Sequence, residues 1–282
     1  SMANLLFAVE EAFAITLDGG FEAGFDTVEV LALMVEARLA AGQADPGASG
    51  QAQALAARLV PHLAQWPGRR LGRAGLVRSL AGAAAATPQA NLFWVFQSGQ
   101  ELAQLSAALD DALCLYGLRS GHLALDYTPE TLAALGRLYA DEIASVAPSG
   151  PLVLGGNCQG GLVIREAGLE LMRQGREVTL TILMEQGRFH NYPAPTLLIF
   201  GAGSYLNPYG QIAGPEQVFR TAYPAGHAVE IIPGAHGQYF ASDAVGALAA
   251  AILRHLDPQR RAPELPRRTP GADPAPDVLF QT

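Results

Sequence analysis

The chain has 282 residues, half of them hydrophobic, which is enough for one sizeable core and a smaller appendage. Its net charge is −8 and it carries no large basic cluster, so nucleic acid is not an expected partner. It has no recognisable signal peptide and no apolar run of 18 residues, which argues against insertion into a membrane. Two cysteines, Cys114 and Cys158, do not indicate a disulfide framework, and we expect a reducing, cytoplasmic environment.

Residues 1–41 are predicted to form two amphipathic helices, because apolar residues recur at helical spacing in each half. Asp26 and Glu29 have the spacing of a capping box at the start of the second helix. Two helices of this length cannot bury both apolar faces by themselves, so this segment should be the C-terminal part of a larger helical domain.

Residues 42–90 are predicted to connect this segment to the next domain. Residues 42–52 are rich in Gly, Ala, Pro and Ser, which is typical of a flexible linker. Residues 53–87 are rich in Ala and Arg and have a mostly helical pattern, and we expect the arginines to form a solvated face. These arginines are Arg69, Arg70, Arg73 and Arg78.

Residues 91–257 alternate between strands and helices, which predicts an α/β fold with a mostly parallel sheet and helices on both faces. The predicted strands are Asn91–Phe96, Leu113–Tyr116, Leu152–Leu154, Val178–Met184, Pro195–Phe200 and Val229–Ile232. Thr128 and Pro129 predict the start of a helix that runs towards Val146, and a final amphipathic helix is predicted at Ser242–Leu256. Residues 258–282 are proline-rich with little apolar content and are predicted to be a disordered tail.

The stretch from Pro151 to Met184 is predicted to form a strand, a tight turn, a helix and a second strand. Its turn reads Gly156-Asn157-Cys158-Gln159-Gly160, the G-x-S-x-G pattern of a nucleophile elbow with cysteine in place of serine. Glycine on both sides lets strand and helix pass close together at a strained central residue. A buried cysteine is usually an inert apolar residue, which is what we expect of Cys114, but this context indicates that Cys158 is a nucleophile.

An elbow cysteine needs a base and an acid that orients the base. His236 follows a predicted strand and precedes the last helix, which is the position of the base in an α/β-hydrolase. Glu185 directly follows the strand after the elbow helix, so its carboxylate should face the same edge of the sheet. The loop after the next strand has no carboxylate, and Asn207 in that loop is the alternative orienting residue. The other histidines have less suitable positions, namely His62, His122, His190, His227 and His255.

Two backbone N–H groups, those of Gln159 and Ser98, are the predicted oxyanion donors. Gln159 follows the nucleophile, and Ser98 lies in the loop after the strand Asn91–Phe96. A thiol depends less on the third triad residue than an alcohol does, because the thiol is already more acidic. No cofactor and no metal site are predicted in this domain.

Residues 91–256 resemble the type I thioesterase domains of nonribosomal peptide and polyketide synthases, which have the α/β-hydrolase fold. The matching pieces are NLFWVFQSG, CLYGLRSG and GPLVLGGNCQGGLVIREAGLELMRQGREVTLTILMEQ. The resemblance implies a triad of Cys158, His236 and Glu185. The chain departs from the family in three ways: a cysteine for serine, a glutamate for aspartate, and only about nine residues before Pro195 where a helical lid is expected. Such a short lid should leave the site open to a bulky or protein-bound acceptor.

Within residues 1–41, LLFAVEEAFAITL and FDTVEVLALMVEARL are similar to the second half of an acyl or peptidyl carrier protein. This resemblance implies a carrier-protein partner, in cis or in trans, that presents the substrate on phosphopantetheine. The pantetheine serine of that family lies just before this segment, and Ser1 falls slightly too late for that role to be assigned. The two resemblances together imply release of a carrier-bound chain by cyclisation, transfer or hydrolysis in natural-product biosynthesis.

Three other functions are compatible with these motifs. A shuttling acyltransferase would move aminoacyl groups to a second carrier protein and would react poorly with water. A polyhydroxyalkanoate-synthase-like polymerase also has a G-x-C-x-G-G elbow, but the aspartate that this family has after a later strand is missing here. A non-catalytic hydrolase-fold module would only bind a carrier, and its Cys158 would resist both alkylation and acylation.

Overall fold

The computed structural model describes residues 48–80, 90–109, 113–186, 191–212 and 214–256. The predicted carrier-like segment (residues 1–41) and the predicted tail (residues 258–282) lie outside these ranges, as does His190. Within the described residues, none of the helices combines the length and the apolar character needed to cross a membrane.

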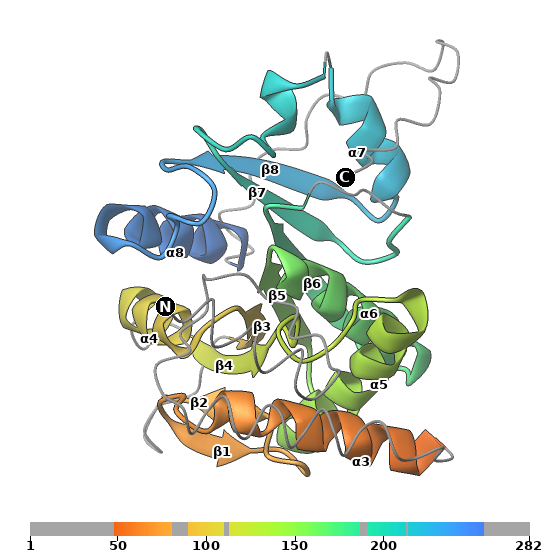
Figure 1. Cartoon of the computed structure of the whole chain (residues 1–282). Coiled ribbons are helices and arrows are strands. Elements are labelled where there is room, and N and C mark those ends of the chain that lie inside the picture. The colour runs from red at the N-terminus through yellow and green to blue at the C-terminus, as the bar shows by residue number, and fades with distance from the viewer. Residues whose placement is uncertain (1–47, 81–89, 110–112, 187–190, 213, 257–282) are drawn as a thin grey trace, which may run out of the picture.

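A sheet of eight strands forms the centre of the described structure, in the order β1-β2-β4-β3-β5-β6-β7-β8 (Figure 1). The six strands from β4 to β8 in this order are parallel to one another, whereas β1 and β2 are antiparallel at one edge, where β2 pairs with β4. The strands are β1 (Arg69–Leu71), β2 (Val77–Ser79), β3 (Asn91–Phe96), β4 (Cys114–Arg119), β5 (Leu152–Asn157), β6 (Val178–Met184), β7 (Thr196–Gly201) and β8 (His227–Ile232). The predicted α/β fold with a mostly parallel sheet is therefore confirmed.

Helices cover both faces of this sheet (Figure 1). One face carries α4 packed against α8, the other carries α5 packed against α6, and α3 lies beside α5. The helices are α3 (Ala48–Leu59), α4 (Gly99–Leu109), α5 (Pro129–Val146), α6 (Gln159–Arg173), α7 (Glu216–Ala222) and α8 (Ser242–Leu256), with short 3-10 turns η1 (Pro61–Leu63) and η3 (Pro208–Gly210). The start of α5 is as predicted: the Thr128 hydroxyl accepts from the N–H of Thr131, and Pro129 occupies the first turn.

Packing in the middle of the sheet positions the end of β5. The ring of Trp94 in β3 lies against Gly155 in β5, where a Cβ would come within 2.2 Å of it, so glycine makes room for the indole. The indole N–H of Trp94 donates to Oδ1 of Asn157 at 3.0 Å. Asn157 is the last residue of β5, so the buried core holds the residue that immediately precedes Cys158.

The segment before residue 91 differs from the predicted linker and helical connection. Helix α3 begins at Ala48, inside the predicted linker, and residues 69–79 form strands β1 and β2 of the main sheet rather than a helix. Gly72 and Gly75 between the strands have φ values of 89° and 72°, which interrupt a helix. The buried Glu142 of α5 accepts from the N–H groups of Ala74 and Leu76. These two hydrogen bonds hold the turn between β1 and β2. The local pattern of apolar residues does not predict them, because Glu142 is distant in the sequence.

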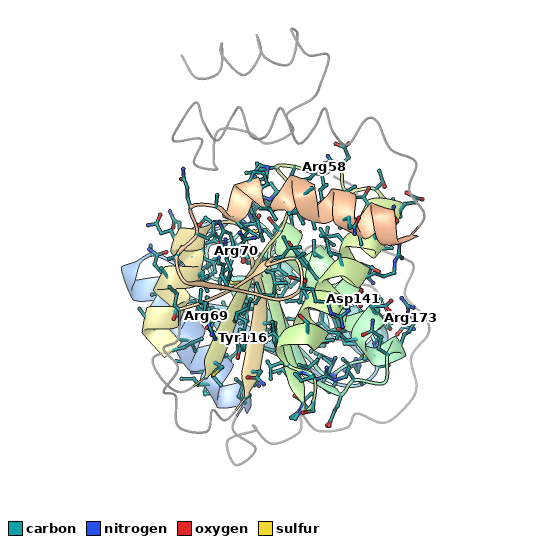
Figure 2. All side chains as sticks on the ribbon, turned by 90° about the horizontal axis from the view of Figure 1, so that it is seen from below. Arg58, Arg69, Arg70, Tyr116, Asp141 and Arg173 are labelled. Carbon is teal, nitrogen blue, oxygen red and sulfur yellow. The ribbon has the colours of Figure 1, made fainter. Side chains whose placement is uncertain are left out.

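The expected solvated arginine face is only partly present. Arg69 and Arg70 of the β1–β2 hairpin are exposed, as Figure 2 shows from the side of α3 and the hairpin, and Arg73 is exposed as well. Arg78 is instead buried, and its guanidinium donates to the carbonyls of Leu63 and Gly75. The prediction is therefore wrong for Arg78, because β2 points this side chain into the structure, where two backbone carbonyls accept from its terminal nitrogens.

Candidate active site

The turn between β5 and α6 has the geometry of a nucleophile elbow. Cys158 has φ 48° and ψ −126°, a strained conformation for a residue with a side chain, and α6 begins at the next residue. A Cβ at Gly156 would lie 2.6 Å from the carbonyl oxygen of Gly160. A Cβ at Gly160 would lie 2.3 Å from the carbonyl oxygen of Val95. Both positions leave no room for a side chain, which is why the pattern needs glycine there.

Cys158, His236 and Glu185 lie together at the C-terminal edge of the sheet. The Sγ of Cys158 is 3.6 Å from Nε2 of His236, and Nδ1 of His236 is 3.0 Å from Oε2 of Glu185. The side chain of His236 is 30% exposed, whereas that of Glu185 is fully buried. A carboxylate at Nδ1 favours the tautomer that carries its proton there, which leaves Nε2 free to accept a proton from the thiol.

The loop after β7 holds the acid in place, although it contains no carboxylate of its own. Oε1 of Glu185 accepts from the N–H of Gly201 at 2.7 Å, and Oε2 accepts from the hydroxyl of Ser204 while it also faces His236. Glu185 has a positive φ of 57°, so its backbone is strained in the same sense as that of Cys158. Each carboxylate oxygen thus has a donor, which directs the buried charge towards the imidazole.

Tyr239 is a further buried neighbour of the acid. A Cβ at Gly201 would lie 2.6 Å from the Tyr239 hydroxyl, so this residue and β7 approach each other closely. Burial and then the nearby Glu185 raise the pKa of Tyr239. Tyr239 therefore remains a neutral phenol beside the carboxylate.

Ser204→Ala is expected to lower kcat by about tenfold for a reaction in which His236 acts as the base, because one hydrogen bond to a charged group contributes about 1.5–3 kcal/mol. KM should change little, since the Ser204 hydroxyl donates to Glu185 and acts through this carboxylate rather than on the substrate. Steady-state kinetics would measure both constants. Ser145→Ala is the matched control, because that hydroxyl donates to a carbonyl within α5. Equal kcat values for the two variants would contradict the orienting role of Ser204.

The remaining described histidines have other partners. The imidazole contacts Ser120 in His122, the rings of Phe219 and Tyr223 in His227, and Glu230 in His255, whereas for His62 it is the backbone carbonyl that accepts from Arg119. Burial and then Arg119 lower the pKa of His122 to about 4, so His122 is neutral at physiological pH. Asn207, the alternative orienting residue, accepts from the N–H of Tyr209 and caps η3. It therefore does not serve as the partner of His236.

The two predicted oxyanion donors lie at the same edge of the sheet. Gln159 is the first residue of α6, and Ser98 lies between β3 and α4, next to β5 in the sheet. The carboxylate of Glu101 accepts from the N–H of Gln97 at 2.8 Å and also has a backbone hydrogen bond from Ser98, although burial raises the pKa of Glu101. The Ser98 N–H remains a predicted oxyanion donor, and it would have to be shared with Glu101.

Two glutamine side chains hold the elbow, and the sequence motifs do not predict them. The side-chain amide of Gln186 donates to the carbonyl of Cys158, and that of Gln97 donates to the carbonyl of Asn157 at 2.8 Å. Gln97 in turn accepts from the Ser120 hydroxyl at 2.9 Å. Both glutamines lie within two residues of the end of a parallel strand, and polar residues at that position are the signal that could identify them.

The connection between β6 and β7 is short. It comprises the 11 residues 185–195, which are too few for the helical lid that the resemblance to thioesterases implies. Tyr192 anchors part of it: its ring is buried, its hydroxyl lies 3.0 Å from that of Thr181, and its N–H donates to the carbonyl of Ala222. The partial exposure of His236 agrees with this arrangement.

Solved structures with a similar fold include thioesterases. The NocB thioesterase domain from the nocardicin cluster is 20% identical with a TM-score of 0.52, over 64% of this chain and 98% of that chain. YbtT, a type II thioesterase of the yersiniabactin pathway, is 18% identical with a TM-score of 0.51, over 66% of this chain and 100% of that chain. The chain has a thioesterase-like α/β-hydrolase fold. At these identities the likeness establishes the fold alone.

Two further relatives are much longer than this chain, so that the match covers only a small part of each of them. A four-domain nonribosomal peptide synthetase bound to AMP and glycine is 16% identical with a TM-score of 0.51, over 72% of this chain and 23% of that chain. A non-reducing polyketide synthase of Pseudevernia furfuracea is 29% identical over 113 residues, which are 38% of this chain and 5% of the synthase. The chain thus spans a small part of both relatives. No protein-family model matches it.

Proposed function

We propose that this chain takes an acyl or peptidyl group from a phosphopantetheine carrier onto Cys158 and releases it by cyclisation, transfer or hydrolysis in natural-product biosynthesis. The observation that carries the proposal is the contact series from Cys158 to His236 and on to Glu185, at 3.6 and 3.0 Å, on a strained elbow. The thioesterase-like fold supports the reaction class, and the nocardicin and yersiniabactin thioesterases support the setting.

In the proposed acylation, Nε2 of His236 takes the proton of the Cys158 thiol, and the thiolate attacks the carbonyl carbon of the carrier thioester. The oxyanion forms beside the backbone N–H of Gln159. Its collapse breaks the bond between the carbonyl carbon and the pantetheine sulfur, and His236 returns its proton to that sulfur. Glu185 stabilises the protonated imidazole and does not take the proton itself.

The cysteine favours transfer over simple hydrolysis. Acylation of Cys158 exchanges one thioester for another, so there is little net change in free energy and the acyl group keeps its activation. A seryl ester would lose part of that activation. An acyl-cysteine therefore suits an amine, a second thiol or an internal nucleophile that closes a ring.

A carrier protein, in cis or in trans, is the proposed partner. The resemblance of residues 1–41 to part of a carrier supports this proposal. The phosphopantetheine would belong to the carrier, so the hydrolase domain itself would need no cofactor.

Transfer between two carrier proteins is the second candidate function. The short connection between β6 and β7 and the 30% exposure of the His236 side chain favour an acceptor as large as a carrier-bound thiol. This reaction differs from chain release only in its acceptor, and its product stays bound to protein.

Thiol release from a panel of acyl-pantetheine thioesters tests the proposed function, with water, an amine or a second holo-carrier as acceptor. We expect repeated turnover with at least one acyl class, and loss of turnover after iodoacetamide treatment that labels Cys158. A product on the second carrier would identify the transferase. The proposal would be contradicted if no thioester were turned over and iodoacetamide did not label Cys158. That result would favour the carrier-binding module.

A further inference from the structure

An exposed aromatic ring lies against the proposed base. Tyr205, in the loop after β7, is 67% exposed, and its ring centroid is 5.0 Å from that of His236 with the planes inclined by 48°. Few large apolar side chains are exposed in the described ranges; they are Tyr205, Tyr209 and Ile231. The Tyr205 ring stays outside the core and contacts the imidazole. It therefore faces the molecules that approach His236.

The loop that carries Tyr205 is tied to both the acid and the base. Ser204 donates to Glu185, and the Ser204 hydroxyl in turn accepts from the N–H of Leu206 at 3.0 Å. The N–H of Gly203 donates to the carbonyl of Gly234 at 2.9 Å, in the loop that leads to His236. Adjacent residues of one turn therefore contact the two polar members of the triad, with Ser204 on the acid and Tyr205 on the base.

We propose that Tyr205 selects the acceptor that attacks acyl-Cys158. Its ring contacts the imidazole of His236 at a tilt of 48°. In this proposal, the ring limits the approach of water to the base, which would otherwise deprotonate it. The same ring offers an apolar surface to an acceptor amine or thiol that carries an aromatic or aliphatic group. This inference rests on the proposed function, because it concerns the second half of that reaction.

The step that Tyr205 influences is the deacylation. The acceptor X–H loses its proton to Nε2 of His236, X attacks the carbonyl carbon of acyl-Cys158, and the carbon–sulfur bond breaks. His236 then returns the proton to Sγ, which restores the Cys158 thiol. When the acceptor X–H is water, the product is the free acid. When the acceptor is an amine, the product is an amide.

Competition between water and amines for one acyl-enzyme tests the proposal in the full chain. An acyl-pantetheine thioester is turned over in the presence of 2-phenylethylamine or ethylamine, and the ratio of amide to free acid is measured by mass spectrometry. In Tyr205→Ala we expect the ratio for 2-phenylethylamine to fall by about two- to tenfold, because an aromatic contact has a modest energy. Tyr205→Phe should keep the wild-type ratio, and Tyr205→Gln, with a polar side chain and no ring, should behave like the alanine variant.

Tyr209→Ala is the matched control. Tyr209 is another exposed tyrosine of the same loop, but its ring contacts Phe219 rather than His236. A product ratio that is the same in Tyr205→Ala, Tyr209→Ala and the wild-type chain would overturn the role of Tyr205, as would an equal fall in both alanine variants. Failure of the wild-type chain to form acyl-Cys158 would instead contradict the proposed function itself, so the two failures are distinguishable.

Discussion

Cys158→Ala is expected to lower thioester turnover by about 10³-fold or more, because only binding and oxyanion stabilisation remain when the nucleophile is removed. Alanine keeps the Cβ and removes the Sγ that lies 3.6 Å from His236, so the strained turn and its flanking glycines are retained. Thiol release under saturating substrate would measure the loss, and circular dichroism would confirm that the fold is unchanged.

Cys114→Ala is the control for this substitution. Cys114 is the other free thiol of the chain; it is half-buried at the start of β4 and lies far from the C-terminal edge of the sheet. Turnover in this variant should equal that of the wild-type chain. Retained turnover in Cys158→Ala would contradict the assignment of the nucleophile, whatever the behaviour of Cys114.

His236→Gln is expected to reduce the rate of acylation by about 10²- to 10⁴-fold, the usual contribution of a positioned general base. Glutamine keeps a polar side chain near Glu185 and Cys158 but cannot take the thiol proton. Single-turnover acylation, followed by rapid quench and intact-protein mass spectrometry, would isolate this step from deacylation.

His227→Gln is the matched control for the base. His227 is a half-buried histidine at the start of β8 that packs near Phe219 and Tyr223, away from the triad. Its replacement should leave the rate of acylation within about twofold of the wild-type value, the scale of ordinary substitutions outside a site. A similar loss in both variants would indicate a general effect on the fold and would remove the support for His236 as the base.

The sequence pattern is sufficient to predict the elbow turn and the proximity of Cys158, His236 and Glu185, because the requirements there are local or topological. Gly156 and Gly160 flank a residue whose strained backbone leaves no room for their side chains. His236 and Glu185 could be identified by their places after parallel strands, since the carboxyl ends of such strands converge on one edge of the sheet. The triad distances agree with that topological expectation.

The parts that the sequence does not predict depend on contacts between distant segments. Glu142 holds the β1–β2 hairpin. Its carboxylate accepts hydrogen bonds from two backbone N–H groups that lie 66 and 68 residues away in the sequence. Ser204 donates to Glu185, which lies 19 residues away in the sequence, and no motif marks Ser204 in the loop after β7. Short-range periodicity carries no information about such partners, so these residues emerge only when the fold is known.

Intact-protein mass spectrometry after brief incubation with an acyl-pantetheine thioester tests directly whether Cys158 forms a covalent acyl-enzyme. We expect a single acyl adduct that maps to Cys158, is present in Cys114→Ala and is absent in Cys158→Ala. Absence of any adduct in the wild-type chain under conditions where thiol is released, or an adduct that persists in Cys158→Ala, would contradict covalent catalysis by the elbow cysteine.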